Sequence, residues 1–201
     1  MLSGFYAVLD RDDEALARTL LSSGAKILQV RLKPQGTRVG ARDVLRVARM
    51  ARSLCDEHGA KLIVNDRFDV ALLAKADGVH LGQTDLPIAA VRAIVGTSLL
   101  IGVSTHDLAQ VRAAVNAGAD YLGYGPVFGT TTKENPDPVQ GLDALRLAAS
   151  AAGDVPVVAI GGITADRAAE VYATGARAIC AISAVNQAAD VGLAARSFAR
   201  S

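Results

Sequence analysis

The sequence predicts an α/β protein built as a closed barrel of eight parallel strands. Eight short apolar segments alternate strictly with eight helix-like segments along the 201 residues, and this order is typical of a parallel barrel surrounded by helices. Hydrophobic residues make up 51% of the chain and aromatic residues only 4%, as expected for a parallel α/β core of Ala, Val, Leu and Ile. No Pro/Gly/Ser-rich linker interrupts the chain, so residues 1–201 are predicted to form a single domain.

Each predicted strand is a short run rich in apolar and β-branched residues. The helices show apolar residues at spacings of three and four, most clearly at Val44, Val47, Ala48 and Ala51, and Gly24 ends the first helix. An open doubly wound sheet is the alternative fold, but no dinucleotide-type glycine motif follows the first strand. The predicted strands are residues 5–9, 27–33, 62–65, 79–81, 99–103, 121–125, 157–160 and 178–182. The predicted helices are residues 13–21, 44–55, 68–73, 87–95, 108–117, 142–151, 165–173 and 188–199.

The charge balance argues against partners that bind through a global field. Twenty-one basic and twenty acidic residues give a net charge of +1, so neither nucleic acid nor a membrane surface is expected as a partner. We expect no signal peptide, because the first residues lack a basic region followed by a long apolar one, and no membrane span, because no apolar run is long enough. Cys55 and Cys180 lack partners at metal-binding or redox spacing and are predicted to be reduced thiols in a cytoplasmic protein. A homo-oligomer is compatible with the sequence.

Two aspartates follow consecutive predicted strands. Asp66 follows the strand at 62–65, and Asp85 comes shortly after the strand at 79–81. If these strands are parallel neighbours, the two carboxylates lie side by side and suit a Mg²⁺ ion that is shared with substrate phosphates. Each aspartate alone could instead cap the helix that follows it.

The segment Gln29-Val30-Arg31-Leu32-Lys33 alternates polar and apolar residues. Strands in a parallel sheet are usually apolar on both faces, so three long polar side chains on one face require an explanation. Within a barrel that face points inward, where Arg31 and Lys33 could bind a phosphate. The alternative is a solvated edge strand.

Further candidates follow the later strands. Ser104 could belong to the site or could form a capping box with Asp107. His80 is expected to be a hydrogen-bonded core or rim histidine, and neither His80 nor His106 is assigned a catalytic role. The segment that holds Thr130, Thr131, Thr132 and Lys133 could close over an anion or could be an ordinary surface loop. Gly161-Gly162 after the seventh strand and Ile182-Ser183 after the eighth lie where such barrels commonly bind phosphate.

Taken together, these segments resemble the thiamine phosphate synthase family, also called thiamine phosphate pyrophosphorylase. The resemblance covers almost the whole chain, and it departs from the family pattern only at Leu9 and Gly129, neither of which is assigned a role. The matching motifs are Gln29-x-Arg31-x-Lys33, Asn65-Asp66-Arg67, Asp77-Gly78-Val79-His80-Leu81-Gly82-Gln83-x-Asp85, Gly102-x-Ser104-x-His106, Gly125-Pro126-x-Phe128-x-Thr130-x-Thr132-Lys133 and Gly161-Gly162-Ile163.

The resemblance implies a TIM barrel and a transferase. Such an enzyme joins 4-amino-2-methyl-5-hydroxymethylpyrimidine diphosphate to 4-methyl-5-(2-hydroxyethyl)thiazole phosphate and releases pyrophosphate. It implies that Asp66 and Asp85 hold Mg²⁺. Binding of the pyrimidine diphosphate is implied for Gln29, Arg31, Lys33, Asn65, Ser104 and Lys133, of which Arg31, Lys33, Ser104 and Lys133 are the expected catalytic residues. Binding of the thiazole phosphate is implied for Thr130, Thr131, Thr132, Gly162, Ile182 and Ser183.

The expected mechanism is dissociative: pyrophosphate leaves first, and the thiazole nitrogen then attacks a carbocation on the pyrimidine methylene. Two rival functions remain. A related thiazole tautomerase would not need the pair Asp66 and Asp85. A non-catalytic sensor of phosphorylated ligands would need neither a metal centre nor the loop that carries Lys133.

Overall fold

Eight parallel strands form a closed barrel in the computed structural model, which describes residues 2–32, 39–130 and 138–199. Each strand pairs with the next one in the chain, and β8 pairs with β1 to close the barrel. The predicted fold class is therefore confirmed. The strands are β1 (Gly4–Leu9), β2 (Ile27–Val30), β3 (Lys61–Asn65), β4 (Gly78–Leu81), β5 (Leu100–Thr105), β6 (Tyr121–Tyr124), β7 (Val157–Ile160) and β8 (Ala178–Cys180).

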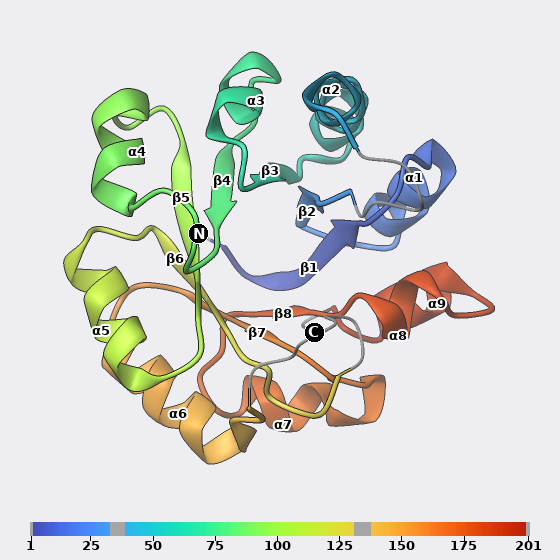
Figure 1. The fold of residues 1–201 in the computed structure, drawn as a ribbon. Coiled ribbons are helices and arrows are strands. Elements are labelled where there is room, and N and C mark those ends of the chain that lie inside the picture. The colour runs from blue at the N-terminus through green and yellow to red at the C-terminus, as the bar shows by residue number, and fades with distance from the viewer. Residues whose placement is uncertain (1, 33–38, 131–137, 200–201) are drawn as a thin grey trace.

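Helices follow the strands and form a ring around the barrel, which Figure 1 shows in a view along its axis. Their buried faces pack against the outer faces of the strands, which explains why the strands are apolar on both sides. The helices are α1 (Glu14–Ser22), α2 (Ala41–His58), α3 (Phe68–Leu73), α4 (Ile88–Val95), α5 (Leu108–Asn116), α6 (Gly141–Ala152), η1 (Ala165–Arg167), α7 (Ala168–Tyr172), α8 (Ser183–Asn186) and α9 (Val191–Arg196).

A second cluster of buried side chains fills the barrel interior. It is smaller than the cluster between strands and helices, and two tyrosines from opposite parts of the barrel are among its largest members. The interior is therefore a packed core, as expected for this fold. The cluster consists of Leu2, Tyr6, Val8, Ile27, Ile63, Tyr121, Val158, Ala178 and Cys180.

Several predicted elements are wrong in extent: α2 is longer than the predicted 44–55, and the helix predicted at 165–173 divides into η1 and α7. The strand predicted at 27–33 ends at Val30, so Arg31 and Leu32 lie beyond it. The helix predicted at 188–199 is shortened to α9, and a separate short helix, α8, lies before it. Asp190 separates them because its extended backbone begins α9 and its side chain accepts a hydrogen bond from the Leu193 N–H at 2.8 Å.

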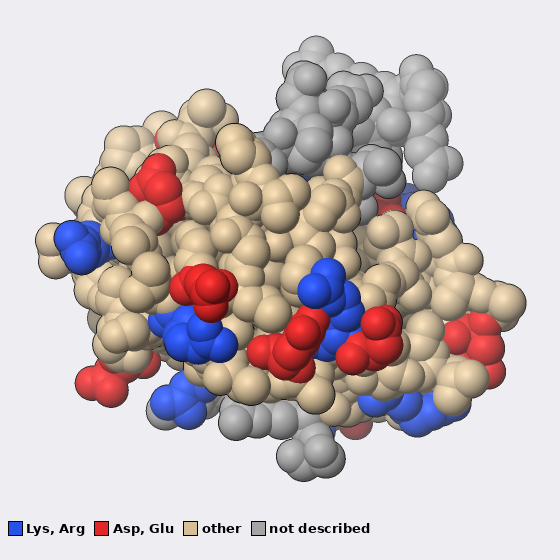
Figure 2. Space-filling model, turned by 90° about the horizontal axis from the view of Figure 1, so that it is seen from below, with Lys and Arg blue, Asp and Glu red and all other residues tan. Residues whose placement is uncertain are grey.

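The surface carries charges of both signs. On the face seen in Figure 2, Lys and Arg side chains are interspersed with Asp and Glu. Ion pairs such as Arg146–Asp143 and Arg167–Glu170 are of this exposed kind. Among the described residues, the helices are all too short or too polar to cross a membrane. Both cysteines are free and buried, as the sequence predicts.

Candidate active site

A cavity of about 900 Å³ lies at the carboxyl ends of the strands. Its lining combines side chains from inside the barrel with residues of the segments that follow the strands. Nine of the residues that the sequence assigns to the site lie together there: Gln29, Arg31, Asn65, Asp66, Ser104, Thr130, Gly162, Ile182 and Ser183. Asp85 is not in the lining but interacts with Asp66. Lys33, Thr131, Thr132 and Lys133 lie outside the described residues.

Asp66 and Asp85 follow strands that are parallel neighbours. Strand β3 pairs with β4, and the backbone N–H of Asp66 donates to the carbonyl of His80 at 2.7 Å. Asp66 itself has φ +60°, and the next N–H, that of Arg67, donates to the Asn65 carbonyl at 2.6 Å. This three-residue turn is a strained conformation for a residue with a side chain. It directs the chain out of β3 at the rim of the cavity.

Neither aspartate caps a helix. Helix α3 begins after Arg67, which provides no side-chain cap. Helix α4 begins after Pro87, also without a side-chain cap. The Asp85 carboxylate instead accepts a hydrogen bond from the Gly82 N–H at 2.6 Å. The helix-cap alternatives for Asp66 and Asp85 are therefore wrong.

The two carboxyl groups interact directly. Partial loss of solvent around Asp66, together with the charge and hydrogen bond of Asp85, raises the pKa of Asp66 to about 6, while Arg31 acts in the opposite direction. Two carboxylates that repel each other at neutral pH suit a hard divalent cation. The described residues contain no cluster of three or more His, Cys, Asp and Glu side chains that could hold a metal. A cation at this pair would thus need further ligands from water or substrate.

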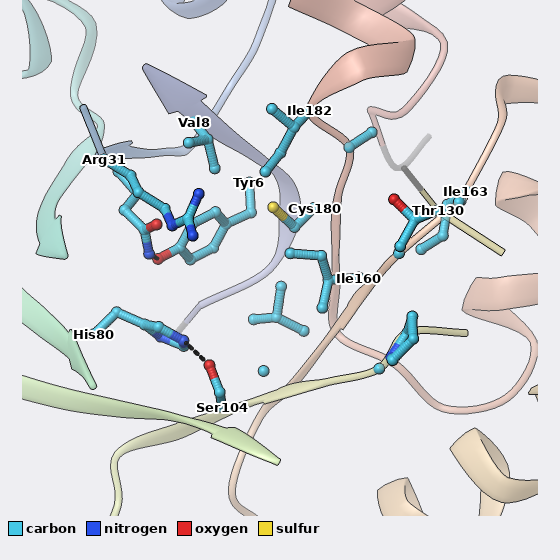
Figure 3. Close-up of a pocket in the computed structure, with 18 of the residues that line it drawn as sticks. Tyr6, Val8, Arg31, His80, Ser104, Thr130, Ile160, Ile163, Cys180 and Ile182 are labelled. Carbon is cyan, nitrogen blue, oxygen red and sulfur yellow. Dashed lines mark hydrogen bonds between the residues drawn. The ribbon is translucent and has the colours of Figure 1, made fainter. Parts of the chain in front are cut away.

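Gln29 and Arg31 reach the cavity from β2 and its end. Gln29 is buried, and its Nε2 donates to the Tyr6 hydroxyl at 2.8 Å. Figure 3 shows Arg31 directed toward the interior beside Tyr6, whereas Leu32 packs against the outer core. The alternative of a solvated edge strand is wrong, because the barrel is closed.

Ser104 lies within β5, so the predicted capping box is also wrong. Asp107 alone caps α5 and accepts a hydrogen bond from the Gln110 N–H at 2.8 Å. The Ser104 hydroxyl lies 2.9 Å from Nε2 of His80, the contact drawn as a dashed line in Figure 3. His80 is therefore the hydrogen-bonded rim histidine that the sequence predicts.

Several lining residues have no predicted role. Tyr6 and Tyr121 join Gln29 to His80 through their hydroxyl groups. Nδ1 of His106 lies 2.6 Å from the Gly125 carbonyl oxygen, and because a carbonyl only accepts, Nδ1 carries the proton and donates it. The only sequence signal for the tyrosines is a hydroxyl group inside an otherwise apolar strand.

The glycine pair allows two segments to meet above the barrel. Gly162 has φ +62°, and a Cβ atom there would lie 2.3 Å from the Gly129 carbonyl oxygen. The Phe128 N–H donates to the Gly161 carbonyl at 2.9 Å, and the Arg167 guanidinium lies 3.5 Å from the centre of the Phe128 ring. The glycine pair therefore supports the segment that carries Thr130, whether or not a phosphate is bound.

Enzymes built on this barrel carry their active sites at the end where this cavity opens. A carboxylate pair and an arginine at that end suit a phosphorylated small molecule. The fold and the position of the cavity thus define a barrel enzyme that acts on small molecules. A family model described as thiamine monophosphate synthase matches residues 5–185. The chain belongs to that family.

Individual relatives are similar in sequence to this chain over most of their length. The chain is 44% identical to a thiamine-phosphate synthase of Methanospirillum hungatei, over 92% of this chain and 87% of the relative. It is 46% identical to one of Chloroflexus aurantiacus, over 94% and 84%. A solved thiamine phosphate pyrophosphorylase from Pyrococcus furiosus superposes with a TM-score of 0.87 at 38% identity, covering 97% and 93%. A 3-hexulose-6-phosphate synthase at 19% identity and a TM-score of 0.68 shows the fold alone.

Proposed function

We propose that this enzyme is a thiamine-phosphate synthase. It condenses 4-amino-2-methyl-5-hydroxymethylpyrimidine diphosphate with 4-methyl-5-(2-hydroxyethyl)thiazole phosphate and releases pyrophosphate. The observation that carries the proposal is the contact between Asp66 and Asp85 beside Arg31, in a chain that is 44% identical to a protein of that name. Neither a tautomerase nor a sensor would require such an arrangement for a diphosphate.

Mg²⁺ is the cofactor that we propose. Asp66 and Asp85 would hold it, because they provide hard oxygen ligands and leave positions for water and phosphate. When bound, the ion neutralises charge on the diphosphate group. The raised pKa of Asp66 supports this assignment, since a carboxylate pair of this kind is stabilised by a cation.

The side chains of the cavity would then divide between two substrates. Arg31 would bind the diphosphate through its planar guanidinium and stabilise its charge as the C–O bond breaks. Gln29, Asn65 and Ser104 would hold the pyrimidine. Thr130, Gly162, Ile182 and Ser183 would hold the thiazole phosphate, and Lys33, Thr131, Thr132 and Lys133 would complete the two sites.

The protein's task is to stabilise charge and exclude water. The aminopyrimidine ring can delocalise positive charge from its methylene carbon, so pyrophosphate leaves before the thiazole nitrogen forms the new C–N bond. No described residue needs to act as a nucleophile. Apolar lining residues such as Val8, Ile160 and Ile163, which Figure 3 shows around the cavity, keep water from the reactive carbon. We place this reaction in the cytoplasm, consistent with two free buried thiols.

The direct test is to mix both precursors with the protein, with and without Mg²⁺, and to detect thiamine phosphate by mass spectrometry. We expect Mg²⁺-dependent product, and we expect Asp66→Asn to lose most turnover while it stays folded. Asp143→Asn is the matched control, because Asp143 is an exposed residue of α6 that pairs with Arg146. Absence of product with Mg²⁺ would contradict the function, and near-normal turnover of Asp66→Asn would contradict the metal assignment. Isomerised thiazole without condensation would identify a tautomerase.

A further inference from the structure

Five polar side chains form a continuous hydrogen-bonded chain across the barrel interior. Nε2 of Gln29 lies 2.8 Å from the Tyr6 hydroxyl, which lies 3.0 Å from the Tyr121 hydroxyl. The Tyr121 hydroxyl lies 3.0 Å from Nδ1 of His80, and Nε2 of His80 lies 2.9 Å from the Ser104 hydroxyl. These residues come from β1, β2, β4, β5 and β6. Both end members, Gln29 and Ser104, line the cavity.

The number of protons on these five side chains determines which group donates and which accepts in each hydrogen bond. An amide nitrogen only donates, so the Tyr6 oxygen accepts from Gln29 and the Tyr6 proton goes to Tyr121. Tyr121 accepts that bond and gives its own proton to Nδ1 of His80. Since Nδ1 is then an acceptor, a neutral imidazole carries its proton on Nε2 and donates it to Ser104.

The ring and hydroxyl groups are neutral, as this count requires. Both ring nitrogens of His80 lie against hydroxyl groups, at 3.0 Å and 2.9 Å, and no described carboxylate is hydrogen-bonded to the ring, so the barrel interior favours the neutral imidazole. Burial raises the pKa of Tyr6 and of Tyr121 well above the usual value. The chain therefore contains one proton for each hydrogen bond.

We infer that His80 and Tyr121 are positioning residues that orient the hydroxyl group of Ser104. Because Ser104 accepts from Nε2 of His80, its own proton is left to donate into the cavity. Its side chain has no second partner among the described residues. The bound pyrimidine diphosphate must therefore present a hydrogen-bond acceptor to Ser104. The identity of this substrate rests on the proposed function, whereas the direction of the chain does not.

The tautomer of His80 can be measured without substrate. In protein labelled with ¹⁵N-histidine, protonated and unprotonated ring nitrogens have well-separated chemical shifts, and the His80 signals are those lost in His80→Gln. We expect the Nε2–H tautomer in the unmodified protein. The opposite tautomer would overturn the inference.

Gln29→Glu should reverse the direction of donation in all four hydrogen bonds. At a pH of about 8 the Glu side chain is expected to be ionised and only accepts, so Tyr6 must donate to it and Tyr121 must donate to Tyr6. His80 would then donate from Nδ1 and accept from Ser104. Retention of the Nε2–H tautomer would overturn the claim that Gln29 sets the direction. If this variant does not fold, the tautomer of the unmodified protein still decides the direction, because a proton on Nδ1 there would contradict donation from Tyr121.

Kinetics can test whether Tyr121 acts through Ser104. Tyr121→Phe keeps the ring that packs against Gly102 but removes the donor to His80, and we expect kcat to fall about tenfold with KM for the thiazole phosphate unchanged. In a Ser104→Ala background the same substitution should have no further effect, because the group that it orients is absent. Tyr172→Phe on α7 is the matched control and removes a hydroxyl that donates to the Phe198 carbonyl at 2.9 Å.

The two failures are distinguishable. Additive losses in Tyr121→Phe and Ser104→Ala would show that Tyr121 acts independently of Ser104 and would overturn the positioning role. If the protein forms no thiamine phosphate at all, the proposed function fails, but the tautomer measured in the free protein still decides the direction of the hydrogen-bonded chain.

Discussion

Asp66 combines backbone strain with electrostatic repulsion at one position. Its φ of +60° is unfavourable for a residue with a side chain, and Asp85 contributes to its raised pKa. Asn tolerates the left-handed conformation at least as well and carries no charge. Asp66→Asn should therefore raise the free energy of unfolding of the metal-free protein at pH 7 by up to about 1 kcal/mol, while it removes activity. Urea denaturation checks this. A large loss of stability would contradict the claim that strain and repulsion from Asp85 make Asp66 unfavourable in the metal-free protein.

The raised pKa of Asp66 beside Asp85 also predicts how pH affects Mg²⁺ binding. Because the pKa of Asp66 is raised from 3.8 to about 6, the metal-free protein retains this proton between these two values. A cation must displace that proton, so its affinity should fall as the pH decreases below about 6. Calorimetric titration of Mg²⁺ at several pH values, in buffers of different ionisation enthalpy, checks both the affinity and the released proton. Affinity that does not change between pH 7 and pH 5 would contradict the prediction.

Hydrogen bonding between distant strands is the part of the site that the sequence does not show. Asp66 and Gln29 are visible as polar residues at the end of, or within, an apolar segment. Tyr6, by contrast, contacts Tyr121 across 115 positions of the chain, and nothing in either strand indicates the partner. Only the closure of the barrel brings these two hydroxyl groups together.

At the scale of elements, two aspartates connect the amino ends of neighbouring strands. Asp77 precedes β4, accepts from the Leu62 N–H of β3 at 2.8 Å and pairs with Arg52 of α2 at 2.6 Å. Asp120 precedes β6, accepts from the Ile101 N–H of β5 at 2.7 Å and pairs with Arg92 of α4. These contacts lie at the end of the barrel opposite the cavity, where residues serve stability rather than catalysis.

Replacing Asp77 by Asn should therefore destabilise the protein without affecting kcat. We expect a loss of about 1–3 kcal/mol at pH 7, because a charge-assisted network loses its acceptor. Burial would raise the pKa of Asp77, but hydrogen bonds from Leu62 and Arg52 outweigh it and lower the pKa. This stabilisation is present above about pH 4 and is lost as the pH falls through the folded-state pKa. The difference from the unmodified protein should thus shrink in acid, and Asp143→Asn should change stability by less than about 0.5 kcal/mol.

The alternation of strand-like and helix-like segments predicts the fold better than it predicts the residue at which each element ends. Strict alternation of apolar segments determines a barrel whichever residue ends each strand. Alternation of polar and apolar residues through Lys33 also suggests a strand, although pairing with β1 and β3 stops at Val30. Ser104 similarly has the spacing of a capping box with Asp107, yet it continues β5 and faces the interior. Local patterns cannot decide such cases, because tertiary pairing determines where each strand ends.

At the scale of the whole molecule, the site is divided among many strands of one closed sheet. The described lining residues come from β1 to β8 and the segments that follow them. A ligand that joins these segments therefore stabilises the barrel as a unit. Every strand pairs with a neighbour on both sides. A single strand therefore cannot shift its register alone, and its cavity-lining side chains stay in place relative to those of its neighbours.

Pyrophosphate and Mg²⁺ together should therefore raise the melting temperature of the protein. A ligand at about 100 times its Kd adds about 2.7 kcal/mol, which corresponds to roughly 5–10 °C for a chain of this size. Pyrophosphate alone should give a smaller shift, because only Arg31 among the described cations lines the cavity, and Mg²⁺ alone should give little. Scanning calorimetry of the protein and of an Asp66→Asn, Asp85→Asn double variant separates these contributions. An equal shift in the double variant would mean that pyrophosphate binds without the carboxylate pair, and it would remove the reason for placing the metal there.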